Sequence, residues 1–79
     1  MINVALRAEV RLVLEEIYNA FMRDGYVNED DISDELGDWF DEVEDCDDAT
    51  LKAAYALARS TDNETGVATL KAALDMLAA

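Results

Sequence analysis

The sequence predicts an all-α protein, a compact bundle of four short helices in a single domain that spans residues 1–79. Three observations lead to this prediction. Apolar residues recur every three or four positions in four separate segments, which is the spacing of one helix face. No segment combines Val- and Ile-rich composition with strict alternation, so we expect no sheet. The chain contains no Pro, and the links between the four segments are short, as is typical of a helical bundle.

The first helix is expected over residues 3–24. Its buried stripe consists of Leu6, Val10, Val13, Leu14, Ile17 and Phe21. Gly25 follows the last turn, where a left-handed C-cap is expected. Leu12 falls outside the stripe. A single exposed Leu is ordinary, but with Ala5, Ala8 and Met22 nearby it could also form a small contact patch.

The second helix is expected over residues 30–45, capped by Asn28 or Asp30. Its apolar positions follow the spacing i, i+4, i+7, i+8 and i+11 and comprise Ile32, Leu36, Trp39, Phe40 and Val43. They lie within an arc of about 100° on a continuous helix, so we expect Trp39 and Phe40 in the core. Gly37 lies inside this helix, where Gly costs about 1 kcal/mol relative to Ala. We expect it to allow the close approach of a neighbouring helix.

The third and fourth helices are expected over residues 49–60 and 65–77. Asp47 or Asp48 caps the third helix, and a polar turn over residues 60–64 separates the two. The core face of the third helix comprises Leu51, Ala54, Tyr55 and Ala58. That of the fourth comprises Val67, Leu70, Leu74 and Leu77. With Ile17 and Phe21, the side chains of Leu51, Tyr55, Leu70 and Leu74 should therefore form the centre of the core.

Charge is distributed very unevenly along the chain. Residues 24–48 contain 13 of the 19 acidic residues and no Lys or Arg. The other residues carry six acids and six bases, so the net charge of −13 resides in this one segment. A pI near 4.1 argues against direct binding to nucleic acid or to anionic membranes, and it favours basic protein partners.

The acidic segment is predicted to present its carboxylates on one face of the second helix. The arc opposite the apolar stripe comprises Asp31, Asp34, Glu35, Asp38, Asp41, Glu42 and Asp45. Within this set, Asp34, Asp38, Asp41 and Asp45 form a row about 16 Å long with neighbours about 5–6 Å apart. Asp31, Glu35 and Glu42 form a second row beside it. These seven residues are the predicted partner-binding site.

Catalysis and cofactor binding are not expected. Paired carboxylates need a pocket that separates their pKa values before they can do acid–base work, and an exposed helix face offers none. Cys46 lacks the basic neighbour that activates a nucleophilic thiol, since the chain contains no His. It is interpreted as a thiol at a helix end, at the boundary of the core. We therefore expect a protein that is not an enzyme and that has no cofactor.

A metal site is not expected either. Residues 24–31 are similar to the second half of a calcium-binding EF-hand loop. Ala20 and Met22, however, occupy the positions of the first two carboxylate ligands, and both are apolar. The single Cys and the absence of His exclude the usual zinc sites.

Double-stranded DNA is also a rigid array of negative charge, so a folded acidic helix can occupy a Lys- and Arg-lined groove that is built for phosphates. In its size, its charge and its acidic helix, the chain resembles the phage-encoded DNA-mimic inhibitors, which include anti-CRISPR and anti-restriction proteins. The resemblance implies a non-enzymatic inhibitor that binds the nucleic-acid-binding groove of a CRISPR effector complex or a similar host defence nuclease and blocks DNA binding. It implies action in the host cytoplasm, as a monomer or weak homodimer.

Two alternatives remain open. Bacteriocin immunity proteins are also acidic four-helix proteins, so the chain could be an immunity or antitoxin-type module that neutralises a single basic toxin, or an adaptor. The acidic face could also serve solubility alone, although a net charge of about 2–8 suffices for a domain of this size. A cytoplasmic location without membrane contact is expected, because no signal-peptide pattern follows Met1 and no apolar run approaches ~20 residues.

Overall fold

The computed structural model describes residues 4–78, and within that range it contains five α-helices and no strand. The helices are α1 (Val4–Asp24), α2 (Glu29–Gly37), α3 (Phe40–Asp45), α4 (Ala49–Arg59) and α5 (Ala68–Ala78). The predicted all-α class is confirmed. The predicted first residue of the first helix, Asn3, lies outside the described residues.

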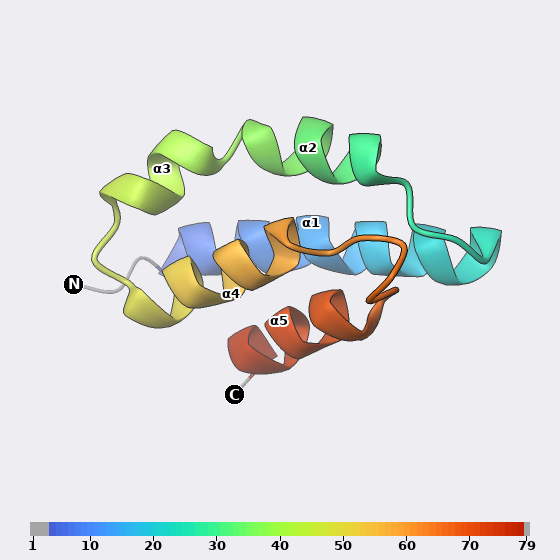
Figure 1. Ribbon diagram of the computed structural model, residues 1–79. Coiled ribbons are helices and arrows are strands. Elements are labelled where there is room, and N and C mark those ends of the chain that lie inside the picture. The colour runs from blue at the N-terminus through green and yellow to red at the C-terminus, as the bar shows by residue number, and fades with distance from the viewer. Residues whose placement is uncertain (1–3, 79) are drawn as a thin grey trace.

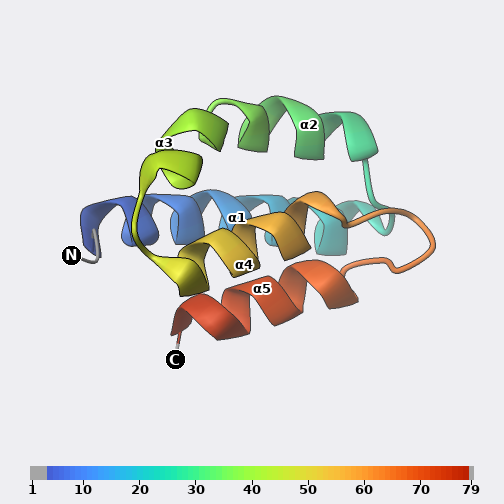
Figure 2. The same cartoon turned by 60° about the vertical axis from the view of Figure 1, so that its left-hand side comes forward.

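The five helices are arranged around the long helix α1 (Figures 1 and 2). α2 and α3 follow one another along one side of α1 and run in the opposite direction to it. α4 and α5 form an antiparallel pair on another side, and they are the most extensively packed pair of helices. Because α4 also contacts α2 and α3, the apolar side chains of all five helices meet in one core.

The core contains most of the predicted stripes. On α1, Leu6, Val10, Leu14, Ile17 and Phe21 are buried, and Val13 is partly buried at the edge. The other helices contribute Ile32, Leu36, Val43, Leu51, Ala54, Tyr55, Ala58, Leu70, Ala73 and Leu77. Val27, in the link between α1 and α2, is also buried. The helical periodicity therefore identified most of the side chains that hold the fold together.

The predicted helix over residues 30–45 is broken into α2 and α3, which corrects the prediction of four helices. At the break, the N–H of Trp39 donates to the carbonyl oxygen of Leu36 over 3.1 Å, a tighter turn than that of an α-helix. The hydroxyl of Tyr55, from α4, donates to the same oxygen. Gly37 precedes the break and lowers the helix propensity there. Together these features end α2 at Gly37, whereas the predicted helix continued to Asp45.

The break changes the burial of the residues around it. Phe40 was expected in the core, but its side chain is 40% exposed, and the guanidinium carbon of Arg59 lies 5.0 Å from the centroid of its ring. Trp39 is only partly buried against the core, as is Leu74 on α5. The prediction that Gly37 allows a neighbouring helix to approach is wrong, because no heavy atom of another helix lies within 4 Å of the place where a Cβ would be.

The helix ends follow the predicted capping residues. Gly25 adopts φ +81°, and its N–H donates to the carbonyl oxygen of Phe21 over 2.8 Å. Asn28 caps α2, with its side-chain oxygen 3.1 Å from the main-chain nitrogen of Asp30. Asp48 caps α4, with Oδ1 3.0 Å from the main-chain nitrogen of Leu51.

The last helix begins three residues later than predicted, at Ala68 instead of Thr65. Asp62 Oδ1 accepts a hydrogen bond from the N–H of Thr65 over 2.8 Å and closes a turn. Gly66 then adopts φ +61°, which a right-handed helix does not allow. The helix can therefore begin only after this residue.

Candidate partner-binding surface

The seven predicted site residues are all exposed, and they belong to the layer formed by α2, α3 and the turn between them. α2 carries Asp31, Asp34 and Glu35, the junction carries Asp38, and α3 carries Asp41, Glu42 and Asp45. The inner side of the same layer buries Ile32, Leu36 and Val43. We call the seven carboxylates the acidic face. The predicted separation of an apolar inner side and an acidic outer side is present in the structure.

The straight row of carboxylates that the sequence predicted is not present. Asp34 lies on α2, Asp38 lies in the turn between the helices, and Asp41 lies on α3. The i, i+4, i+7 spacing applies only within a continuous helix, so the row changes direction at Asp38. Figures 1 and 2 show this bend between α2 and α3. The acidic face therefore consists of two short segments at an angle.

The acidic face has no directly paired base within the described residues. Across residues 4–78, none of its seven carboxylates forms an ion pair or a side-chain hydrogen bond. Several bases are instead paired with acids outside it. The ion pairs Arg11–Glu15, Arg23–Asp24 and Lys71–Asp75 have N–O distances of 3.2, 3.4 and 3.2 Å. The seven carboxylates are therefore exposed and have no direct ion-pair partner within the described residues.

One residue of the acidic segment has a structural role. Asp48 is only 2% exposed, and its carboxylate accepts two hydrogen bonds from Arg7, from Nε over 2.8 Å and from Nη2 over 2.7 Å. It also caps α4. The Arg7 guanidinium, followed by the main-chain N–H of Leu51, lowers the pKa of Asp48 below its usual value of 3.8. The capping role was one of two predicted options, whereas the ion pair joins residues 41 positions apart and has no local sequence signal.

The thiol of Cys46 lies directly after α3 and is partly buried against the core, as predicted. Its Sγ is 3.0 Å from the carbonyl oxygen of Val43, to which it donates. Over residues 4–78, no three His, Cys, Asp or Glu side chains form a group that could hold a metal ion. None of the helices in that range has the length and apolar content needed to cross a membrane.

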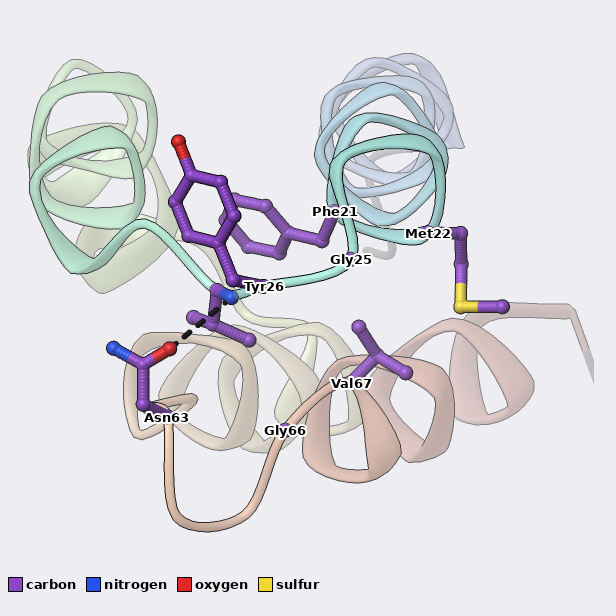
Figure 3. A pocket seen from close by; sticks show the side chains of 8 residues that line it. Phe21, Met22, Gly25, Tyr26, Asn63, Gly66 and Val67 are labelled. Atoms are coloured by element: carbon purple, nitrogen blue, oxygen red, sulfur yellow. Dashed lines mark hydrogen bonds between the residues drawn. The ribbon is translucent and has the colours of Figure 1, made fainter.

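One hollow of the described surface lies away from the acidic face. It has a volume of about 370 Å³ and is open to solvent between the end of α1 and the turn before α5 (Figure 3). It is lined by Phe21, Met22, Gly25, Tyr26, Val27, Asn63, Gly66 and Val67, none of which is charged. The N–H of Val27 donates to Oδ1 of Asn63 over 3.2 Å across one side of it. Sequence reasoning missed this hollow, because it is formed by segments about 40 residues apart.

A second hollow, of about 170 Å³, lies between α1 and α2 and includes part of the acidic face. Ile17, Ala20 and Phe21 provide its apolar residues. Its charged residues are Glu16 from α1 and Asp31 and Glu35 from α2. We call it the α1–α2 groove. Glu16 was not among the predicted site residues, and only the packing of the two helices brings it there.

The contact patch considered around Leu12 is divided in the structure. Leu12 is 57% exposed and shares a shallow hollow with Ala8, Arg11 and Glu15. Met22 is 58% exposed but lines the hollow of Figure 3 instead. These residues therefore do not form one continuous apolar surface.

Comparison of the chain with protein-family models, with curated proteins and with solved structures gave no match. What the acidic face can do must therefore be argued from its charge and geometry. Ionised carboxylates only accept hydrogen bonds, so the face is suited to a surface rich in Arg and Lys donors.

Proposed function

We propose that this protein is a non-enzymatic inhibitor that binds the nucleic-acid-binding groove of a CRISPR effector complex or a similar host defence nuclease. The acidic face enters the groove in place of DNA, and the target then cannot load its substrate. The observation that carries the proposal is the set of seven exposed carboxylates on α2 and α3 that have no cationic partner within the described residues.

The electrostatic argument has two parts. A groove that binds a phosphate backbone presents Arg and Lys side chains at close intervals, and neighbouring carboxylates on a helix are about 5–6 Å apart. Opposite charge also accelerates the encounter of the two surfaces, particularly at low salt. The fold keeps α2 and α3 in place through buried Ile32, Leu36 and Val43, so the charges are ordered before binding.

The bend between α2 and α3 also supports the proposal. A duplex presents its phosphates along curved strands, so a face made of two segments at an angle can follow such a surface without being one straight row. The turn at Asp38 is held by the hydrogen bond from Tyr55 to Leu36, which comes from the opposite side of the core. The shape of the face is therefore fixed by tertiary packing.

The test is affinity capture from a host lysate, with the immobilised protein as bait and mass spectrometry to identify what is bound. The matched bait is the variant Asp34→Asn/Asp38→Asn/Asp45→Asn. Asp38 and Asp45 lie at the C-terminal ends of α2 and α3, where negative charge opposes the helix dipole, so these changes should not weaken the fold. The control variant Glu9→Gln/Glu64→Gln/Asp75→Asn removes the same charge from other surfaces.

The proposal expects capture of a nucleic-acid-processing complex by the wild type and by the control variant, but not by the acidic-face variant. Added duplex DNA should release the complex, because both ligands need the same cationic residues. Capture of a single basic toxin would instead favour the immunity or antitoxin alternative. Equal capture by both variants would contradict a role of the acidic face.

A further inference from the structure

The α1–α2 groove combines an apolar floor with charged sides. Its floor consists of Ile17, Ala20 and Phe21, of which Ile17 and Phe21 are 5% and 3% exposed. Carboxylates stand on both sides, Glu16 on α1 and Asp31 and Glu35 on α2. None of the three forms an ion pair or a side-chain hydrogen bond within residues 4–78. The groove thus offers an apolar floor between unneutralised acceptors.

We infer that this groove receives one arginine side chain of the basic partner, as an anchor for the acidic face. The aliphatic stem of arginine can lie on the apolar floor while its charged head remains among the carboxylates. The guanidinium presents five N–H donors in a planar fork, so it can bond acceptors on both sides of the groove. This assignment rests on the proposed function, and it specifies the chemistry of one contact within it.

Charge complementarity selects this occupant over an apolar one. An apolar side chain would remove water from the carboxylates without replacing its hydrogen bonds, which is unfavourable. A lysine would supply a compact point charge that faces one side of the groove, whereas a guanidinium satisfies several oxygens at once. An arginine therefore uses both the floor and the two carboxylate rims.

The inference adds Glu16 to the binding surface. This residue lies outside the acidic segment, in the part of the chain where acids and bases balance in number. Its position at the groove depends on the packing of α1 against α2. Glu16 should therefore contribute to partner binding more than other exposed acids of α1, such as Glu9.

The test titrates the full-length protein with n-butylguanidinium and follows its main-chain amide signals by NMR. Methylguanidinium, which lacks the stem, and n-butylammonium, which lacks the fork, are the comparison probes. Butylguanidinium should shift the signals around Ile17, Ala20 and Glu35. Its affinity should be at least about fivefold higher than that of methylguanidinium, because each methylene removed from water adds to the affinity. Equal binding of the two guanidiniums would overturn the role of the floor, and equal binding of butylammonium would overturn the choice of arginine.

Two variants make the test specific to the groove. Ala20→Leu fills the floor without changing charge, and it should remove the advantage of butylguanidinium, whereas Ala53→Leu on the exposed side of α4 should not. Glu16→Gln should weaken butylguanidinium binding, and Glu9→Gln should leave it unchanged. Circular dichroism checks that each variant is folded. An unchanged advantage in folded Ala20→Leu would contradict the inference.

The two proposals can fail separately. The acidic-face variant changes Asp34, Asp38 and Asp45, none of which lines the groove. If that variant loses its partner while Ala20→Leu and Glu16→Gln keep both the partner and butylguanidinium binding, the proposed function stands and the arginine anchor is wrong. If no variant affects partner capture while butylguanidinium still binds in the groove, the proposed function is wrong. The groove is then still a binding site for an alkylguanidinium group.

Discussion

The hydroxyl of Tyr55 on α4 donates a hydrogen bond to the main-chain carbonyl oxygen of Leu36 on α2. In a continuous helix, that oxygen would accept from the N–H of Phe40, four residues later. Here that oxygen accepts from the hydroxyl of Tyr55 and from the N–H of Trp39, and the chain turns at Asp38 and Trp39 before α3 begins. This contact explains why the acidic face is bent and why Phe40 is partly exposed instead of buried in the core.

Replacement of Tyr55 by Phe should therefore destabilise the protein. The buried ring is kept, but the Leu36 oxygen retains only the N–H of Trp39 as a donor, which should lower the free energy of unfolding by about 1 kcal/mol. Urea denaturation measures this quantity. Tyr18→Phe is the control, because the hydroxyl of partly buried Tyr18 has no hydrogen bond within residues 4–78. Equal stability of Tyr55→Phe and the wild type would mean that this hydrogen bond does not hold the junction.

Gly37→Ala should stabilise the protein. Gly37 has no positive φ, and a Cβ there would contact nothing within 4 Å. Ala should then add about 0.5–1 kcal/mol by restricting the unfolded chain and favouring helix. Gly25→Ala should do the opposite, because φ +81° is strained for any residue with a Cβ. Thermal denaturation of the two variants gives the comparison, and a destabilised Gly37→Ala would show that the junction needs Gly.

Trp39→Ala should cost more stability than Phe40→Ala. Trp39 is partly buried against the core, whereas Phe40 is 40% exposed beneath the Arg59 guanidinium. We expect losses of about 2–3 kcal/mol for Trp39→Ala and about 1 kcal/mol or less for Phe40→Ala. Urea denaturation provides both values. The reverse order would contradict the burial of these two side chains in the structure.

The Arg7–Asp48 ion pair should control part of the acid sensitivity of the fold. The folded-state pKa of Asp48 is lowered, chiefly by the hydrogen bonds from Arg7, so the folded state binds fewer protons there than the unfolded state. The stability from this group is then present above its usual pKa of 3.8 and is lost as pH falls through the lowered value.

Asp48→Asn should therefore lower Tm at neutral pH and make the decline of Tm below pH 3.8 less steep. Some acid sensitivity should remain, because the Thr65 N–H and hydroxyl also lower the pKa of Asp62. The matched variant is Asp45→Asn, which removes an exposed carboxylate that has no partner within the described residues. A parallel decline of Tm in Asp48→Asn and the wild type would contradict this role.

Several features of the fold could be predicted from the sequence because they are local. The apolar stripe of α1, the left-handed Gly25 and the capping residues Asn28 and Asp48 follow from spacing and residue type. The break at Gly37 could not be predicted, because the apolar spacing around it fits a continuous helix. One of the two donors to the Leu36 oxygen at the end of α2 comes from Tyr55, 19 residues away in sequence.

In the candidate site, too, some features follow from the local sequence and others depend on tertiary structure. The spacing of the seven carboxylates relative to Ile32, Leu36 and Val43 predicts that they lie exposed on one layer. The direction of the face depends on the break, and the position of Glu16 beside Asp31 depends on how α1 packs against α2. The pairing of Arg7 with Asp48, which makes one acid structural, also depends on tertiary structure.

The most direct test of the proposed function is a competition measurement on the captured complex. The loading of fluorescent duplex DNA onto that complex is followed by anisotropy while the protein is added. We expect the wild type and Glu9→Gln/Glu64→Gln/Asp75→Asn to reduce DNA loading, with an effect that weakens as salt is raised. Asp34→Asn/Asp38→Asn/Asp45→Asn should leave DNA loading intact. Normal DNA loading in the presence of saturating wild-type protein, or equal inhibition by both triple variants, would contradict the proposal that the acidic face takes the place of DNA.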